Sequence, residues 1–111
     1  MAFITIAIAE GLDGATRRRA RRSGPRAVAT RADQQQLLRS AGYVDIEEVD
    51  VTAAFLETMR GWVQQRDCHF DELARLEAPG AFEERQRGHR AQLAATEKGL
   101  LRRVLLTAVR P

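Results

Sequence analysis

The chain has 111 residues, of which 44% are hydrophobic and 30% charged, and its formal net charge is +3 at neutral pH. This length allows one domain at most, which we expect to span residues 1–111. The hydrophobic fraction excludes a disordered chain, and no apolar run is long enough to cross a bilayer.

The first predicted element is a strand over residues 1–9, MAFITIAIA. Its isoleucines and Phe3 offer apolar side chains to both faces, as in a strand that helices cover on both sides. No basic segment precedes this run and Glu10 follows it directly, so it does not resemble a secretory signal.

An arginine-rich segment follows, in which residues 15–25 read ATRRRARRSGP. It is typical of a short basic helix or a mobile loop, ended at Gly24-Pro25 because proline cannot continue a helix. Seven arginines and no acid lie between Arg17 and Arg31, which predicts a positive patch. Its candidate anion-binding residues are Arg17, Arg18, Arg19, Arg21 and Arg22.

The next predicted helix covers residues 30–42, TRADQQQLLRSAG. Thr30 is a candidate N-cap with Asp33 three residues on, and Gly42 suits the left-handed position that closes a helix. Its expected inward residues are Leu37, Leu38 and Ala41.

A second strand is predicted over residues 43–51, YVDIEEVDV. Its valines and isoleucine change parity along the run, so either both faces are partly buried or a bulge near Glu47-Glu48 switches the phase.

Helices are predicted for most of the remaining chain. Thr52 is a candidate cap for the first, whose apolar stripe contains Phe55, Met59, Trp62, Leu56 and Val63. Two more helices are expected over residues 67–77 and 81–98; the first brings Phe70, Leu73, Ala74 and Leu76 together, and the second is mostly solvated. The chain then ends in an apolar strand, LLRRVLLTAVRP, with its core at residues 104–109.

This succession resembles the C-terminal, substrate-side half of a class I S-adenosylmethionine-dependent methyltransferase. The resemblance is carried by MAFITIAIA as the fifth strand, LLRSAGY as the end of a helix, VDIEEVDVT as the sixth strand and LLRRVLLTAVRP as the last. It implies an α/β fold with a partial Rossmann-like sheet of about three strands, in the order first-third-second, and four to five helices. The last strand is expected to be antiparallel.

The family's cofactor-binding elements have no counterpart in this sequence. The glycine-rich loop is absent, since Gly11 and Gly14 in EGLDGA form a turn, and so is the acidic residue that holds the ribose hydroxyls. The resemblance therefore implies no cofactor for this chain alone, and S-adenosylmethionine only when a second chain completes the site. The open edge of strand 1–9 is expected to pair with a second copy or with a separately encoded cofactor-binding half.

Phe55, Met59 and Trp62 have two interpretations. An apolar stripe at helical spacing normally belongs to the core, whereas the resemblance places these residues where methyltransferases line the pocket for a small-molecule acceptor. The arginine patch has three interpretations. It is a solvated segment, a lid over an anionic or acyl-bearing substrate as the resemblance implies, or a nucleic-acid surface. The last is not favoured, because no aromatic residue accompanies the arginines to stack on bases.

The chain's cysteine and histidines give no catalytic set. Cys68 and His69 are adjacent on a predicted helix and point about 100° apart, so they do not form a nucleophile and base. His89 lies in a polar helix and is either solvated or a proton-transfer group. A single cysteine excludes an intramolecular disulfide, these three residues are too few for a structural zinc site, and the cytoplasm is the expected compartment.

We therefore expect a methyltransferase-like protein that is inactive alone, with no assigned catalytic residue and no metal. One alternative is a non-enzymatic dimeric module that binds an anionic partner, a nucleic acid or an acidic ligand, through the Arg17–Arg31 patch. Another is the product of a truncated reading frame, with no activity.

Overall fold

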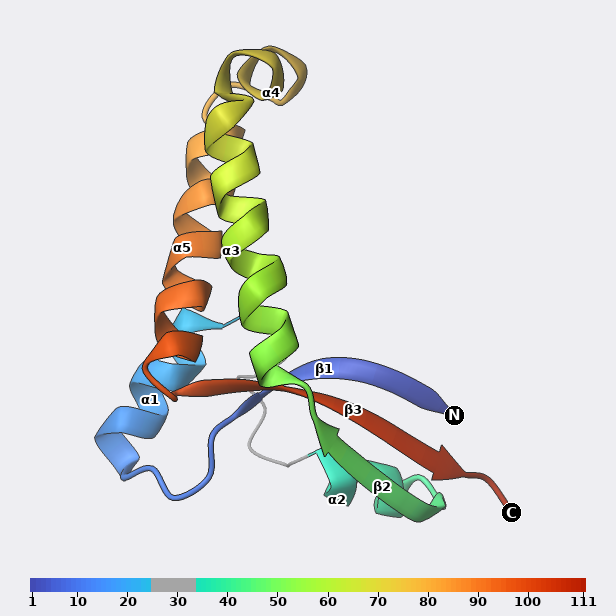
Figure 1. The fold of residues 1–111 in the computed structure, drawn as a ribbon. Coiled ribbons are helices and arrows are strands. Elements are labelled where there is room, and N and C mark those ends of the chain that lie inside the picture. The colour runs from blue at the N-terminus through green and yellow to red at the C-terminus, as the bar shows by residue number, and fades with distance from the viewer. Residues whose placement is uncertain (25–33) are drawn as a thin grey trace.

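The computed structural model describes residues 1–24 and 34–111. This part of the chain forms three strands and five helices (Figure 1). Their bounds are β1 Ala2–Ile8, α1 Gly14–Ser23, α2 Gln34–Ser40, β2 Val44–Asp50, α3 Thr52–Cys68, α4 Phe70–Leu76, α5 Ala81–Glu97 and β3 Leu101–Val109. The predicted α/β class is confirmed, and the arginine-rich segment forms a helix rather than a loop.

The strands form one sheet in the order β1-β3-β2, and β3 is antiparallel to both neighbours. Both features confirm the order and direction expected from the sequence. In the register, Ile4 lies opposite Leu105 on β3, and Val49 of β2 lies opposite the same leucine. The central place of β3 agrees with its composition, because Leu101, Val104 and Leu106 are each at most 1% exposed.

Helices pack on both faces of the sheet and enclose two apolar clusters. The cluster beneath α2 has as its buried members Leu38, Val104, Leu106 and Ala108. The cluster on the opposite face, beneath α1 and the base of α5, has as its buried members Ala20, Ala95, Leu100 and Leu101. Alternation along β3 produces this division, because successive side chains point to opposite faces of a strand.

α3 and α5 rise side by side from the second face of the sheet, with α4 at their far end (Figure 1). We call residues 52–97 the stalk; it gives the molecule an elongated shape of 50 × 33 × 25 Å. No helix in the described ranges, 1–24 and 34–111, has the length and apolar character that a membrane span requires.

The inward face of α2 is narrower than predicted. Leu38 is buried, but Leu37 is 44% exposed and Ala41 is also exposed. The reason is length, because a helix of seven residues makes two turns and sets few side chains against the sheet. Gly42 has φ +87°, the left-handed conformation expected of it. The predicted cap Thr30 with Asp33 lies outside the described residues.

β2 contains the change of phase that one of the two interpretations required. The change lies before Glu47-Glu48 in the chain. Its register against β3 shifts between Val44 and Glu47, where Asp45 has φ +50°. The shift turns Glu48 toward the α2 face, where its carboxylate accepts a hydrogen bond from Arg102 at 2.6 Å.

Thr52 is not the cap of α3. It is the first helical residue, and its backbone N–H donates to Oδ1 of Asp50 at 2.8 Å. Its hydroxyl accepts from the backbone N–H of Arg103 at 3.0 Å and so ties the base of the stalk to β3. Hydrogen bonds from Thr52 hold the pKa of Asp50 below its usual value.

One helix boundary and two expectations of burial were wrong. α4 begins at Phe70 rather than Asp67, and Leu76, predicted to join the apolar group, is 83% exposed at the tip of the stalk. In β1, Ile4 is 53% exposed, so helices cover only part of the strand.

Candidate functional site

The apolar stripe on α3 divides into a buried part and an open part. Phe55 and Met59 are 8% and 2% exposed, whereas Trp62 is 52% exposed. The guanidinium carbon of Arg103 lies 4.6 Å from the centre of the Phe55 ring, which closes the base of the stripe. Of these three residues, Trp62 presents its ring to solvent, and a substrate role for the set stays a prediction.

The arginine patch lies on α1, which begins with a well-formed cap. Oδ1 of Asp13 accepts the backbone N–H of Thr16 at 2.7 Å, and this bond lowers the pKa of Asp13. Within residues 1–24 and 34–111, no arginine of α1 forms an ion pair with a carboxylate, and Arg21 Nε is buried without a hydrogen-bond partner. Arg26 and Arg31 lie outside the described residues. Binding of an anion by this patch stays a prediction.

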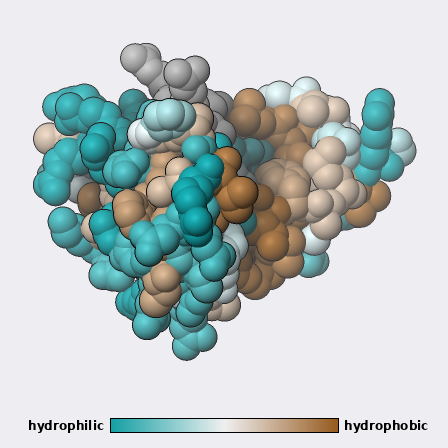
Figure 2. Space-filling model, turned by 90° about the horizontal axis from the view of Figure 1, so that it is seen from above, coloured by the Kyte–Doolittle hydropathy of each residue, from teal (hydrophilic) through white to brown (hydrophobic). Residues whose placement is uncertain are grey.

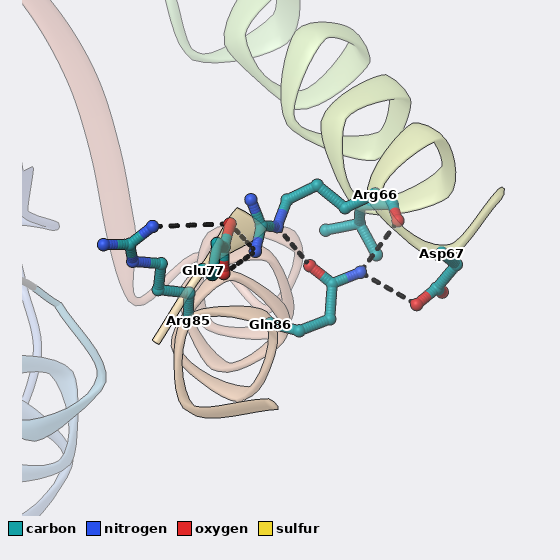
Figure 3. Close-up of polar contacts among 6 residues, drawn as sticks. Arg66, Asp67, Glu77, Arg85 and Gln86 are labelled. Atoms are coloured by element: carbon teal, nitrogen blue, oxygen red, sulfur yellow. Dashed lines mark hydrogen bonds and ion pairs between the residues drawn. The ribbon is translucent and has the colours of Figure 1, made fainter. Parts of the chain in front are cut away.

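A network of polar side chains joins α3, α4 and α5 inside the stalk (Figure 3). At its centre is Gln86 of α5, which is 3% exposed. Its Nε2 donates to the carbonyl of Val63 and to Oδ1 of Asp67, both at 2.9 Å, and its Oε1 accepts from Nε of Arg66 at 3.1 Å. The buried amide is therefore satisfied at both ends.

Arg66 links this amide to a carboxylate that follows α4. Its Nη2 donates to both oxygens of Glu77, at 3.1 and 3.3 Å, and its guanidinium carbon lies 4.9 Å from the Phe82 ring centre. Arg85 reaches the same carboxylate at 3.3 Å from the solvent side (Figure 3). Arg66 thus holds the two long helices and the segment after α4 in one arrangement.

Sequence reasoning missed this network because α5 was expected to be mostly solvated. The signal lay in the spacing, since Gln86 and His89 follow Phe82 at i+4 and i+7 and so share its face. A buried Phe82, 5% exposed, marks that face as inward.

A shallow groove of about 460 Å³ opens beside the network. Phe70 and Phe82 meet edge to face in its wall, with ring centres 5.0 Å apart. Asp67 forms an ion pair with Arg90 at the rim. Hydrogen bonds lower the pKa of Asp67, and the bond from Gln86 has the largest effect. In the described residues no three histidine, cysteine or acidic side chains gather as metal ligands.

His89 is half-buried on the inner side of α5, and its Nδ1 has no hydrogen-bond partner. Burial, followed by the charges of Arg66 and Arg85, lowers the pKa of His89 from its ordinary value of 6.5. The lowered pKa favours the neutral imidazole, and the side chain is only partly exposed to solvent. Cys68 and His69, at the junction of α3 and α4, are both exposed.

We expect His89 to make the protein less stable as the pH falls through 6.5. The unfolded chain then binds a proton that folded His89 resists, so protonation favours unfolding. His89→Gln should remove this decline between pH 7 and 5, as measured by urea unfolding at several pH values. The rest of the chain is the same in both proteins, so its contribution cancels in the difference. A pH-independent difference would contradict the assignment.

No protein-family model matches the chain, and no curated protein matches it. The fold is similar to solved structures that include two of phosphoethanolamine N-methyltransferase 2 from Haemonchus contortus. One is described as a complex with phosphomonomethylethanolamine and S-adenosylhomocysteine, the other with S-adenosyl-L-methionine. Each is 15% identical to this chain, with a TM-score of 0.72 over 99% of it, and the chain spans 26% of the length of each. This likeness shows a methyltransferase-like fold.

The ends of β1 and β2 show what the described residues would offer a nucleoside cofactor. The loop after β1 makes a turn at Gly11, with φ +75°, and the Asp13 carboxylate already occupies the first turn of the helix that follows. The acid at the end of β2, Asp50, accepts the Thr52 N–H. Both carboxylates thus already accept local backbone hydrogen bonds, and the absence of S-adenosylmethionine binding by this chain alone stays a prediction.

Proposed function

We propose that this chain is the acceptor-side portion of an S-adenosylmethionine-dependent methyltransferase and that it transfers no methyl group by itself. The observation that carries the proposal is the fold, which matches two N-methyltransferase structures over 99% of this chain and 26% of theirs. The sequence adds support, because it has no glycine-rich cofactor loop.

In this proposal the chain contributes to positioning rather than to cofactor chemistry. Methyl transfer depends on aligning donor and acceptor, and a chain that lacks the donor site retains little of that effect. Trp62 is the residue that we assign to acceptor contact, because it combines a large aromatic face with 52% exposure. Phe55 and Met59, both buried, would support it by fixing α3 against the rest of the fold.

Calorimetric titration of the purified chain with S-adenosylmethionine tests the proposal. We expect no saturable heat, because the sequence has no glycine-rich cofactor loop. The Haemonchus contortus enzyme, whose complex with S-adenosyl-L-methionine is known, is a suitable positive control. A dissociation constant of about 10 μM or tighter for this chain alone would overturn the claim that a second part is required.

A second assay, of methyl transfer, distinguishes a split enzyme from a chain with no role in methyl transfer. A coding sequence beside that of this chain, with a glycine-rich loop between a strand and a helix, would identify the missing part. Mixing the two products should produce methyl transfer that neither shows alone, and Trp62→Ala should weaken it. Activity that does not depend on this chain would count against the proposal.

A further inference from the structure

The two edge strands of the sheet differ in how they are protected from pairing. β2 carries four acidic residues, Asp45, Glu47, Glu48 and Asp50, and an irregular register at one end. β1 has the sequence AFITIAI, with no charge, proline or glycine. Natural sheets protect exposed edges with charges, proline or bulges. β2 has such protection and β1 has none, which indicates that the edge of β1 is suited to pairing with another strand.

The hydrogen-bonding pattern shows which backbone groups are free. Met1 and Ala108 exchange both backbone hydrogen bonds, at 2.8 and 2.9 Å, and the N–H of Ala9 donates to Leu100. In an antiparallel ladder the bonded residues alternate, so the odd residues of β1 bond to β3. The even residues direct their N–H and C=O groups to the open edge: Ala2, Ile4, Ile6 and Ile8. Within the described chain nothing pairs with that edge.

We propose that two copies of this chain associate through their β1 strands, antiparallel, about a two-fold axis at Thr5. In this register Ile4 faces Ile6 of the second copy and Ala2 faces Ile8, so every even residue of both strands makes its backbone hydrogen bonds. Thr5 faces its own equivalent, and threonine pairs are favourable across strands. The uncharged strand brings no like charges together, although the chain has a net charge of +3.

The neighbouring surface favours the same occupant. Beside the stalk, one face of the sheet stays open, and apolar side chains gather there (Figure 2). Its residues include Ile4, Val44, Val49 and Val109, which are 44–53% exposed, and the partly buried Leu105. Pairing β1 with a second β1 extends the three-stranded sheet and continues this apolar face across the axis. The acidic edge of β2 stops further addition, so the assembly closes as a dimer.

The interface is small and its affinity should be modest. A strand about 24 Å long, in a sheet about 10 Å thick, covers on the order of 240 Å² per copy. A standard stable interface buries about 800 Å² per partner. We therefore expect a weak, reversible and concentration-dependent dimer with a dissociation constant on the order of 100 μM. A second copy and a separate cofactor-binding half would use the same edge of β1, so the two assemblies compete, but failure of the dimer would leave the cofactor titration unaffected.

Sedimentation equilibrium of the wild-type chain and of its Ile4→Pro and Ile4→Val variants tests whether the edge of β1 forms the dimer. The Ile4 N–H is not used by β3, so proline removes a donor from the open edge without breaking the ladder inside the sheet. We expect Ile4→Pro to raise the dissociation constant at least about tenfold and Ile4→Val to leave it within about twofold. A monomeric wild-type chain at about 1 mM, or a fully dimeric Ile4→Pro, would overturn the proposal.

Cross-linking tests the register and does not depend on Ile4→Pro being folded. In a Cys68→Ser background, Thr5→Cys places two thiols at the axis, with α-carbons about 4.5 Å apart, which suits a disulfide. Ala7→Cys is the matched control on the same face, and its two thiols would lie about 14 Å apart. Mild oxidation should cross-link Thr5→Cys alone. Equal cross-linking of both variants, or of neither, would contradict this register.

Discussion

Leu106→Ala is expected to lower the free energy of unfolding by about 3 kcal/mol, within the range of about 2–5 kcal/mol for buried leucines. Leu106 is 0% exposed at the centre of the cluster beneath α2, where Leu38, Val104 and Ala108 surround it. Truncation removes apolar contacts and leaves a cavity that the central strand cannot close. Urea unfolding followed by circular dichroism measures the loss.

Leu105→Ala is the matched control, because it makes the same chemical change one residue away. Leu105 is partly exposed and lies opposite Ile4 and Val49 on the open face. We expect a loss below about 1 kcal/mol, because few atoms are removed from a packed environment. Similar losses from the two substitutions would show that the faces of β3 are assigned wrongly.

Arg66→Ala should cost about 2 kcal/mol of stability, less than the 3–5 kcal/mol for breaking a fully buried pair. The side chains of Arg66 and Glu77 are 18% and 11% exposed, so removing the guanidinium leaves a largely buried carboxylate without the Nη2 donor that contacts both of its oxygens. The substitution also removes a hydrogen bond to Gln86 and the contact with the Phe82 ring. The smaller value reflects the remaining exposure and the second cation, Arg85, near the carboxylate. Thermal unfolding by calorimetry measures the effect.

Arg85→Ala is the control for charge alone. Arg85 contacts the same carboxylate, but its side chain is 61% exposed, and exposed ion pairs contribute little. We expect a loss of at most about 0.5 kcal/mol. Arg66→Lys should fall between the two, since it keeps the charge and loses the planar fork. Equal losses from Arg66→Ala and Arg85→Ala would show that the network acts only through net charge.

Much of the secondary structure could be predicted from local patterns. The apolar runs of β1 and β3, the glycine at residue 42 and the helical spacing of α3 are each local signals. The order β1-β3-β2 came from the family resemblance, because three strands can be arranged in several orders with the same local patterns.

The candidate site was harder to predict, because its polar residues depend on contacts distant in sequence. Gln86 resembles any solvated glutamine of a charged helix, and it is buried because Val63, Asp67 and Arg66 come from another helix to meet it. Trp62 follows Met59 in one apolar stripe, yet one is 52% exposed and the other 2%. Helical periodicity identifies the apolar face of α3, but it does not show how much of that face other elements cover.

By itself, the sequence determined where the strands and most helices form, and it set the contrast between an uncharged β1 and an acidic β2. Only the tertiary structure decided which parts of each face are covered. Ile8 and Ile4 are the same residue type on the same face of β1, but Ile8 packs against the cluster beneath α1 and α5 while Ile4 lies beyond the stalk. Side-chain alternation is a property of the strand, whereas burial depends on where another element packs. MAFITIAIA is therefore covered along part of its length, and no other strand of the described residues pairs with its outer edge.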